Sequence, residues 1–500
     1  MSVDYSYRDI EWCHALHYKN DDCLVDGNII VPDSMDDIAK IVSVKGCPSV
    51  LERKCENGRI NVTGQVKVSV LYIGENDSGK LFTLNTTQSF SHAISAPEVT
   101  DEYLPLVFAT SCNISHTLIN SRRLRTSANV KLCASSYKNN RTKVLSEVYG
   151  AEARSCEKSF VSARSVCAKN IIISDTLELN AGKNPITSIL KHNVRISESD
   201  FKALNNKLIV KGNLSASILY CSDETLNDVT LTIPFTEVVE AEGVSPSSIT
   251  NVSLNVTECE IRPETDLSGE YRMVDINVIL SVCVTAFMKE EATVVTDMYL
   301  PHGALEIETA PIKLHVSAKE ISEEEFFKES ITLPPTAPLI SRIVDTDCRI
   351  SELNHSTSKA EGIAEVTFLY LSPSSAAINT YTARLPISHT FAIPNVSNVR
   401  CSVKHTGYAI TGDSAIDIRI SINFEAMSDE SEDVYVISNC LEKDYTAPKR
   451  NSVTVSFVNK GDTLWSIAKK HNIALSSLAS ANAIDENAIL TVGSKLIIPR

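Results

Sequence analysis

The sequence repeats itself at the length of a domain. A segment that begins with glycine and ends with tyrosine eight residues later occurs three times, at residues 64–72, 212–220 and 362–370. The copies begin 148 and 150 residues apart, and this period is too long for the unit of a solenoid. Each copy is therefore expected to form a domain with its own hydrophobic core. The 500-residue chain therefore predicts several domains, three of which are alike.

Each repeat segment alternates apolar and polar residues with the period of a β-strand. In the first copy, Val66, Val68, Val70 and Tyr72 share one face, and the same places are apolar in the other two copies. Polar residues fill most of the opposite face, which predicts half-buried antiparallel strands. Long amphipathic helices are scarce through residue 440. We therefore predict a mainly β fold, with three repeated β-rich domains followed by a small α+β (βααβ) module.

Composition and spacing give the expected domain ranges. The repeats are expected at 25–140, 183–290 and 335–440, followed by a polar linker at 441–452 and a last module at 453–500. Residues 141–182 give no pattern that places their elements. The acidic run 323–325 and the prolines that follow it predict a stiff, solvated junction before the third copy. If the repeats are real, Tyr72, Tyr220 and Tyr370 should occupy equivalent positions.

The last module predicts the order strand, helix, helix, strand in fewer than 50 residues. Residues 453–458 are rich in β-formers, and Thr463 is the expected N-cap of a helix that ends near His471. Asn472 suits the left-handed residue that closes such a helix, and Asp462 is well placed for the helix dipole. A second short helix follows, and a turn at Gly493 leads into the closing strand.

This order and these residues resemble the LysM family. The matching positions are Val458, Gly461 to Trp465, Ile467, Ala468, Asn482, Ile484, Leu490, Gly493, Leu496, Ile498 and Pro499. Members of the family bind glycans that contain N-acetylglucosamine, through the loop after the first strand and the loop before the last strand. By resemblance these loops are Gly461–Leu464 and Asn487–Thr491.

The resemblance implies the following candidate binding residues: Gly461, Asp462, Thr463, Leu464, Asn487, Ile489, Leu490 and Thr491. The alternative is a purely structural role, because the same residue types also suit a turn and a core. The module departs from the family pattern at two places. Ser456 stands where the family often has an aromatic residue, and Ala474 stands where a capping Ser or Thr is usual.

The rest of the chain offers no catalytic constellation. Neither HExxH nor GxSxG occurs in the first 450 residues. Residues 74–80 have the glycine and lysine spacing of a P-loop, but Leu81 replaces the Ser or Thr that binds magnesium, so a hairpin turn is expected. Cys112 and His116 lack any group that would orient them. We predict a non-enzyme with no catalytic residue, no metal and no cofactor.

Charge, hydropathy and cysteine spacing restrict the classes of partner and the cellular compartment that we expect for this protein. A net charge of −15 argues against nucleic-acid binding, because phosphate binding needs basic surface. No run approaches 18 apolar residues, so no transmembrane span is expected. The first residues do not read as a secretory leader, and none of the fourteen cysteines pair as CxxC. We expect a cytosolic protein with reduced thiols.

A triplicated β domain with this glycine-to-tyrosine strand, followed by a terminal LysM, resembles the SPOCS–LysM spore-coat morphogenetic proteins of spore-forming Firmicutes. The clostridial form of this SipL and SpoVID type fits best. The resemblance implies an adaptor in the mother-cell cytoplasm, at the forespore surface, whose LysM module docks onto the ATP-hydrolysing scaffold protein of the coat basement layer. The alternative is a cell-wall protein that binds peptidoglycan or its precursors.

Overall fold

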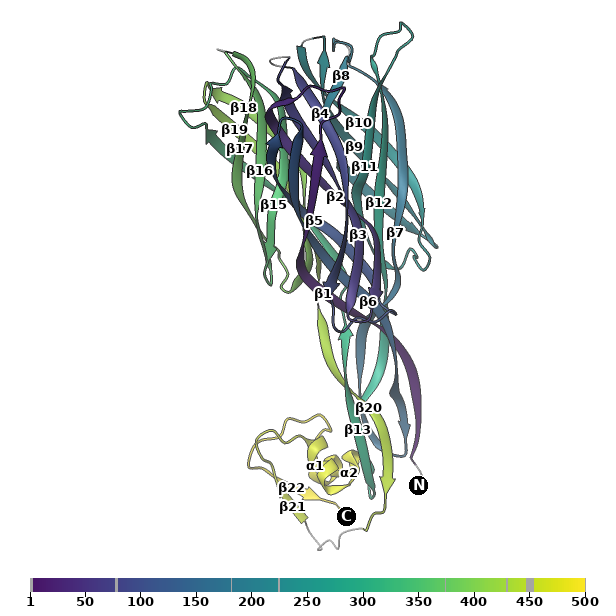
Figure 1. Ribbon diagram of the computed structural model, residues 1–500. Helices are drawn as coiled ribbons and strands as arrows, with labels where there is room; N and C mark the ends of the chain where they lie inside the picture. The colour runs from purple at the N-terminus through teal and green to yellow at the C-terminus, as the bar shows by residue number, and fades with distance from the viewer. Residues whose placement is uncertain are drawn as a thin grey trace.

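The protein is elongated, with a broad head, a narrow stalk and a small C-terminal module beside the foot of the stalk (Figure 1). The computed structural model describes residues 3–76, 80–180, 182–223, 225–373, 375–428, 430–446 and 454–499. Strands β1 to β20 build the head and the stalk, and the helices α1 and α2 lie in the C-terminal module. The predicted fold class, mainly β with a small α+β module, is confirmed.

Each repeat folds into two three-stranded antiparallel sheets. Domain 1 has the sheets β1-β6-β5 and β2-β3-β4, domain 2 has β7-β12-β11 and β8-β9-β10, and domain 3 has β14-β19-β18 and β15-β16-β17. The first strand of every domain therefore pairs with the last. The apolar faces of the two sheets share one core in each domain, as the alternating pattern predicts.

The strands of domain 1 are β1 (Asp4–Ile30), β2 (Ile38–Glu56), β3 (Arg59–Gly74), β4 (Leu81–Ser95), β5 (Leu104–Asn120) and β6 (Arg123–Tyr149). Those of domain 2 are β7 (Glu152–Glu178), β8 (Ser188–Leu204), β9 (Lys207–Ser222), β10 (Thr225–Glu240), β11 (Ile249–Glu264) and β12 (Met273–Tyr299). Those of domain 3 are β14 (Glu320–Thr332), β15 (Arg342–His355), β16 (Lys359–Ser372), β17 (Ser375–Thr390), β18 (Val396–Gly412) and β19 (Ala415–Ser428). Two stalk strands complete the set, β13 (Ala304–His315) and β20 (Ser431–Lys443).

The three repeat tyrosines are equivalent, as predicted. Tyr72, Tyr220 and Tyr370 lie near the ends of β3, β9 and β16, the middle strands of their sheets, and each is at most 1% exposed. The Tyr72 hydroxyl donates a hydrogen bond to the backbone oxygen of Asp36 (2.9 Å), and Tyr220 donates the same bond to Asn184 (3.1 Å). Both acceptors lie 36 residues upstream of their tyrosine. The copies thus share internal contacts as well as topology.

The repeat glycines are explained by close backbone contact. A Cβ atom on Gly64, Gly212 or Gly362 would lie 2.5, 2.3 and 2.3 Å from a carbonyl oxygen of the neighbouring strand. In every copy the neighbouring strand carries a register shift close to this point. Such a shift bends the strand toward its partner, so only a residue without a side chain fits there.

The sheets extend beyond the ranges expected from the sequence. β1 begins at Asp4 rather than near residue 25, β7 begins at Glu152, and β14 begins at Glu320. Each of these strands pairs with a strand from the far end of its own domain, and such a pairing leaves no local spacing signal. We therefore propose 4–149, 152–299 and 304–443 as the structural units. Residues 447–452 of the expected linker lie outside the described part of the chain.

The stalk is formed by hairpin extensions of all three domains. β1, β6, β7 and β12 are each 27 residues long and continue from the head into the stalk. In the third copy this path is divided, so that β13 and β20 form a separate pair below β14 and β19. The stalk core draws on all three copies and consists of Ile10, Trp12, Val144, Phe160, Ala292, Val294, Ile312, Leu314, Val434 and Val436.

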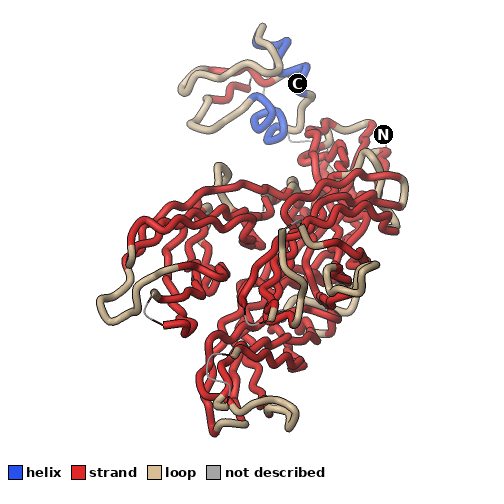
Figure 2. Tube along the Cα trace, turned by 90° about the horizontal axis from the view of Figure 1, so that it is seen from above, coloured by secondary structure: helices blue, strands red, loops and turns tan. Residues whose placement is uncertain are grey.

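The three domains close into a ring in the head. β11 of domain 2 contacts β2 of domain 1, β5 of domain 1 contacts β15 of domain 3, and β18 of domain 3 contacts β8 of domain 2. Seen from above, the strands of the head gather into three lobes (Figure 2). Val42, Leu190 and Val344, which occupy the same register shift in the three copies, meet in one apolar cluster between the domains.

The acidic run 323–325 does not form the expected solvated junction. It lies inside β14, where Ile321, Glu323, Glu325 and Phe327 share a half-buried face. The two ring nitrogens of His389 lie 2.8 Å from a Glu323 carboxylate oxygen and 2.7 Å from a Glu325 carboxylate oxygen. The carboxylates interrupt the apolar alternation of the strand, which is why its sequence reads as a polar linker.

No helix among the described residues is both long and apolar enough to cross a lipid bilayer. The turn with P-loop spacing joins β3 to β4, which are antiparallel neighbours, whereas a P-loop leads from a strand into a helix. Residues 77–79 of that turn lie outside the described residues.

Candidate functional site in the C-terminal module

The C-terminal module has the predicted order of elements. It consists of β21 (Thr454–Phe457), α1 (Leu464–His471), α2 (Leu475–Asn482) and β22 (Lys495–Ile498). β21 and β22 pair antiparallel, and the two helices pack on one face of this small sheet. The buried side chains that join them are Val458, Leu464, Trp465, Ile467, Ala468, Ile473, Leu478, Ala479, Leu496 and Ile498.

The first helix begins and ends as its sequence predicts. The Thr463 hydroxyl accepts a hydrogen bond from the Ser466 backbone N–H (3.1 Å), and the Ser466 hydroxyl lies 2.9 Å from the Thr463 nitrogen, which donates to it. This reciprocal pair is a capping box. Asn472 closes the helix in the left-handed conformation, with φ 48°. Ala474 gives the second helix no side-chain cap, as its departure from the family pattern suggests.

The two predicted loops lie side by side. The Val458 N–H donates to the Ser494 carbonyl (3.0 Å), and the Gly493 N–H donates back to the Val458 carbonyl (2.8 Å). These bonds join the start of the first loop to the end of the second. Gly461 (φ 93°) and Gly493 (φ 84°) both adopt the left-handed backbone that their turns require. The loops form one surface, which we call the loop surface, with exposed residues Gly461, Thr463, Asn487, Ile489, Thr491 and Val492.

Three candidate residues have structural roles instead. Leu464 is only 2% exposed and belongs to the module core. Leu490 is half-buried against the same core, so it is a poor position for a surface substitution. The Asp462 carboxylate accepts a hydrogen bond from the Asn459 backbone N–H (2.9 Å) and thereby closes the turn before α1. The family pattern at these positions therefore reflects folding at least as much as binding.

The most exposed apolar residues of the loop surface are Ile489 and Val492. Ile489 is 99% exposed and Val492 is 63% exposed. Asn487 and Thr491 flank Ile489 and take part in tight turns. The Asn487 N–H donates to the Asp485 carboxylate (2.8 Å), and the Thr491 carbonyl accepts from the Ser494 backbone N–H (3.0 Å). Val492 was not predicted, because the loop given by the family resemblance ends at Thr491. Two exposed aliphatic side chains on a turn-rich loop are suited to contact another molecule.

The outer face of the small sheet is a second exposed apolar area. Val455, Phe457 and Ile497 are 43%, 56% and 50% exposed. The ammonium group of Lys495 lies 5.7 Å from the centre of the Phe457 ring. The alternation of β21 turns Ser456 inward and Phe457 outward. The aromatic residue that Ser456 lacks therefore stands one position later, on the opposite face of the strand.

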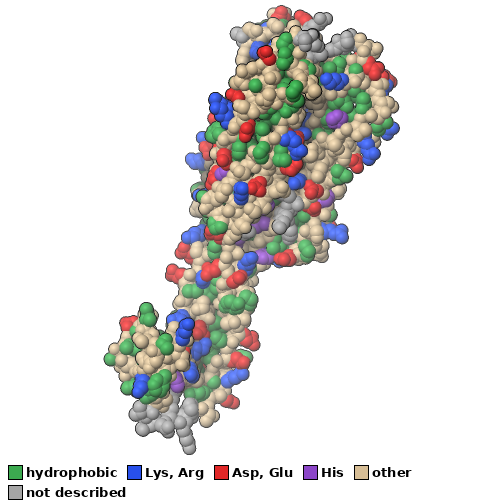
Figure 3. Space-filling model, turned by 90° about the vertical axis from the view of Figure 1, so that its left-hand side faces the viewer, with side chains coloured by type: hydrophobic (Ala, Val, Ile, Leu, Met, Phe, Trp, Pro, Cys, Tyr) green, Lys and Arg blue, Asp and Glu red, His purple; other side chains and the backbone are tan. Residues whose placement is uncertain are grey.

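The remaining face of the module packs on the foot of the stalk (Figure 3). The Trp465 ring meets Tyr299 of β12 edge to face, with centroids 5.0 Å apart, and its Nε1–H donates to Asp297 (2.7 Å). Lys469 pairs with the same carboxylate. The Tyr299 hydroxyl donates to the Ile473 carbonyl (3.0 Å). These contacts hold α1 against the stalk and leave both the loop surface and the outer sheet face open.

Cys112 and His116 in the head do not have the geometry of a catalytic Cys–His pair. Both residues lie on β5, and a separation of four residues along a strand spans roughly 13 Å. Burial, together with nearby Cys47, raises the pKa of the Cys112 thiol to about 12, and the protonated thiol is a weak nucleophile. Among the described residues, no group of three or more His, Cys, Asp and Glu side chains is placed to hold a metal ion.

Comparison with protein-family models gives two matches. The model described as the SPOCS domain of SipL matches residues 37–119 and 185–264, and the LysM domain model matches residues 458–499. These domains match those of a SipL-like SPOCS–LysM protein. No curated protein and no solved structure matches it.

In this SPOCS–LysM protein the SPOCS matches cover β2 to β5 of domain 1 and β8 to β11 of domain 2. The structure adds the long first and last strands, which complete each domain and build the stalk. Domain 3 has the same strand order. SPOCS and LysM are not enzymatic families, and they fit a role in sporulation and a capacity for peptidoglycan binding.

Proposed function

We propose that this SPOCS–LysM protein is a non-enzymatic adaptor of spore-envelope assembly. Its LysM module docks onto the ATP-hydrolysing scaffold protein of the coat basement layer, in the mother-cell cytoplasm at the forespore surface. The SPOCS head and the stalk then present further surfaces for coat assembly. The observation that carries the proposal is the open loop surface of the module, with Ile489 and Val492 exposed while α1 is held against the stalk.

The character of the loop surface supports a protein partner. Exposed aliphatic side chains provide the apolar anchor that protein interfaces concentrate in a few residues. A sugar-binding site would be expected to offer an aromatic platform between the loops, and Ser456 takes the place where the family often has one. The module carries a charge of +2 on an otherwise acidic chain, which would favour an acidic partner surface.

The alternative function is binding of peptidoglycan or its precursors through N-acetylglucosamine. The LysM match favours this alternative, and so does Phe457, which is exposed on the outer face of the small sheet. In that case the ligand would lie on the loop surface, as in the family, or on the outer sheet face beside Phe457.

The test is capture of purified scaffold ATPase by the immobilised full-length chain. Ile489→Asp is expected to weaken capture at least tenfold, because losing an interface anchor costs more than about 1.4 kcal/mol. Leu267→Asp is the matched control, since Leu267 is a fully exposed leucine in a loop of the head. Ile497→Asp tests the outer sheet face.

The same chains are titrated with N-acetylglucosamine oligomers. We expect weak or no sugar binding and undiminished capture by the Leu267 and Ile497 variants. Capture that is equal for the wild type and the Ile489 variant would refute docking through the loop surface. Micromolar sugar affinity that Ile489→Asp or Ile497→Asp abolishes would establish the alternative function.

A further inference from the structure

A cavity of about 350 Å³ lies where the three domains of the head meet. Its walls come from β2 and β5 of domain 1, β8 and β11 of domain 2, and β15, β18 and β19 of domain 3. Ser199 and Ser402 are exposed at its edge, so the space is open to solvent. Its volume falls at the lower end of the range for small-molecule sites in proteins.

The walls of this cavity carry mainly positive charge. Five cationic side chains line it, and Glu425 is the one carboxylate among its described lining residues. The cationic residues are Lys45, Arg195, Arg349, Arg400 and Lys404. The chain as a whole has a net charge of −15, so this gathering of basic groups opposes the general character of the protein.

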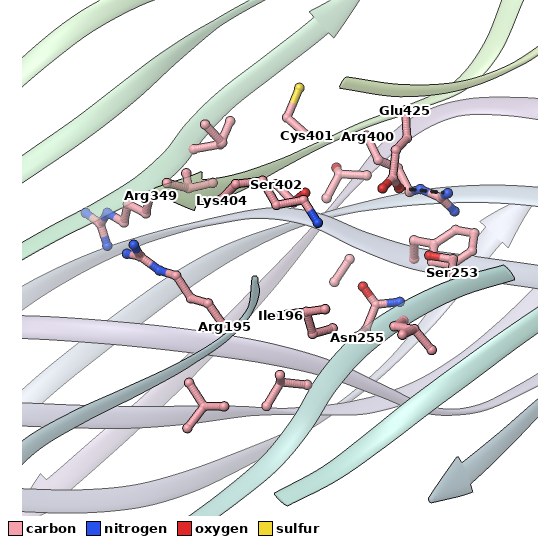
Figure 4. Close-up of a pocket in the computed structure, with 18 of the residues that line it drawn as sticks. Arg195, Ile196, Ser253, Asn255, Arg349, Arg400, Cys401, Ser402, Lys404 and Glu425 are labelled. Carbon is pink, nitrogen blue, oxygen red and sulfur yellow. Dashed lines mark hydrogen bonds and ion pairs between the residues drawn. The ribbon is translucent and has the colours of Figure 1, made fainter. Parts of the chain in front are cut away.

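The arginines are held in place by carboxylates beside the cavity. Arg195 donates to Asp347 (3.0 Å), and Arg349 donates twice to Glu365, from Nη2 (2.8 Å) and Nε (3.1 Å). In Figure 4 the guanidinium groups of these two arginines are both on the side of the cavity away from Arg400. A guanidinium group carries five N–H donors, so each arginine keeps donors beyond those that its carboxylate accepts.

Arg400 lies across the cavity from that pair (Figure 4). It pairs with Glu320 and with Glu425 (3.1 Å), and its guanidinium lies 4.0 Å from the centre of the Phe108 ring. Its Nε–H is buried and has no hydrogen-bond partner among the described residues. A buried donor left without an acceptor is costly, so a ligand oxygen would be favoured here.

Lys404 and Asn255 carry side-chain donors that no described residue accepts. Lys404 makes no ion pair with any described residue, although it stands in the cavity wall. The Asn255 side chain projects from β11 toward the same space (Figure 4). Guanidinium, ammonium and amide donors on several sides of a small space match the acceptor oxygens of a phosphate or carboxylate group.

We propose that this cavity is a binding site for a small oxyanion that carries phosphate or carboxylate groups. The inference is independent of the LysM module. Because all three domains supply donors, bound anion stabilises the closed ring of the head, as any ligand stabilises the state that binds it.

The experiment is calorimetric titration of the full chain with inorganic pyrophosphate, and with citrate as a carboxylate probe, at constant ionic strength. Thermal unfolding is followed in parallel. Wild-type protein is expected to bind at least one of the two probes and to unfold at a higher temperature in its presence. Lys404→Gln is expected to lower that affinity at least fivefold, while Lys328→Gln, which removes an exposed lysine from β14, leaves it unchanged.

Binding of pyrophosphate alone identifies the phosphate class, and binding of citrate alone identifies the carboxylate class, provided that Lys404→Gln weakens it. Absence of binding by both probes would overturn the proposal. Equal affinity of the wild type and the Lys404 variant would overturn it as well, because the anion would then bind elsewhere and the basic residues would serve only to join the domains.

Discussion

Replacing Asp347 with alanine is expected to lower the free energy of unfolding by roughly 3–5 kcal/mol, the usual cost of removing one partner from a buried ion network. Asp347 on β15 of domain 3 lies 3.0 Å from Arg195 and 3.8 Å from Lys191, both on β8 of domain 2. It also lies 3.2 Å from Lys45 on β2 of domain 1. Its side chain is only 13% exposed, so the loss would leave three cations facing one another with little solvent.

The effect is measured as the urea midpoint of the full chain, with Asp26→Ala as the control. Asp26 is an exposed carboxylate on β1, and its removal is expected to change stability by less than about 0.5 kcal/mol. Equal midpoints for the wild type and the Asp347 variant would contradict the view that this carboxylate joins the domains.

The stability that Asp347 contributes depends on pH in a direction that follows from its pKa. Burial acts to raise the pKa of Asp347, but the charges of Lys45, Lys191 and Arg195 outweigh it and hold that pKa below its ordinary range. A carboxylate with a lowered folded pKa contributes its stability above the ordinary carboxyl pKa and loses it as the pH falls toward the folded value. The difference between the wild type and Asp347→Ala should therefore persist at neutral pH and shrink only in strong acid.

Replacing Gly362 with alanine is expected to destabilise domain 3 by about 1–3 kcal/mol, the usual cost of forcing extra volume into a packed site. The new Cβ would lie 2.3 Å from the carbonyl oxygen of Glu352, which belongs to the backbone of β15 and cannot rotate away. β15 and β16 would have to separate at this point, next to the core of the domain.

Gly412→Ala is the matched control for this change. Gly412 ends β18 in the same domain, and a Cβ there would meet nothing within 4 Å. This substitution should be neutral or slightly stabilising, because alanine restricts the unfolded chain more than glycine does. Urea unfolding of both variants compares the two positions, and an equal midpoint for Gly362→Ala and Gly412→Ala would show that the close approach has no energetic consequence.

The repeated middle strands could be predicted because their information is local. Val66, Val68 and Val70 alternate with polar residues, and all three are fully buried in the structure. The capping residues Thr463 and Asn472 were predicted for the same reason, since a helix end is specified by a few neighbouring residues.

The ring and the stalk could not be predicted because they depend on contacts between distant residues. Lys45, Asn193 and Asp347 occupy the same register position in the three copies, yet they differ in charge. Lys45 donates to Asn193 (3.0 Å) and pairs with Asp347, so the three positions complement one another. In sequence, each reads as an ordinary polar residue on the exposed face of a strand.

The candidate site was predicted as two loops but not residue by residue. The family pattern located both loops, whereas it could not separate Leu464 and Leu490, which pack in the module core, from Ile489, which is exposed. That distinction depends on which way a side chain points in an irregular loop, and no periodicity specifies it. The contact of Trp465 with Asp297 could not be predicted either, because the two residues are 168 positions apart in the sequence.

Attachment of this protein to the scaffold at the forespore surface, through its C-terminal module, can be tested by fluorescence microscopy in a sporulating Firmicute. A fluorescent fusion of the full chain is compared with fusions of the Ile489→Asp and Leu267→Asp variants, at matched protein levels. We expect a shell around the forespore for the wild type and for Leu267→Asp, and a diffuse mother-cell signal for Ile489→Asp. A shell of equal intensity for Ile489→Asp, or a wild-type signal along the cell wall, would contradict this attachment.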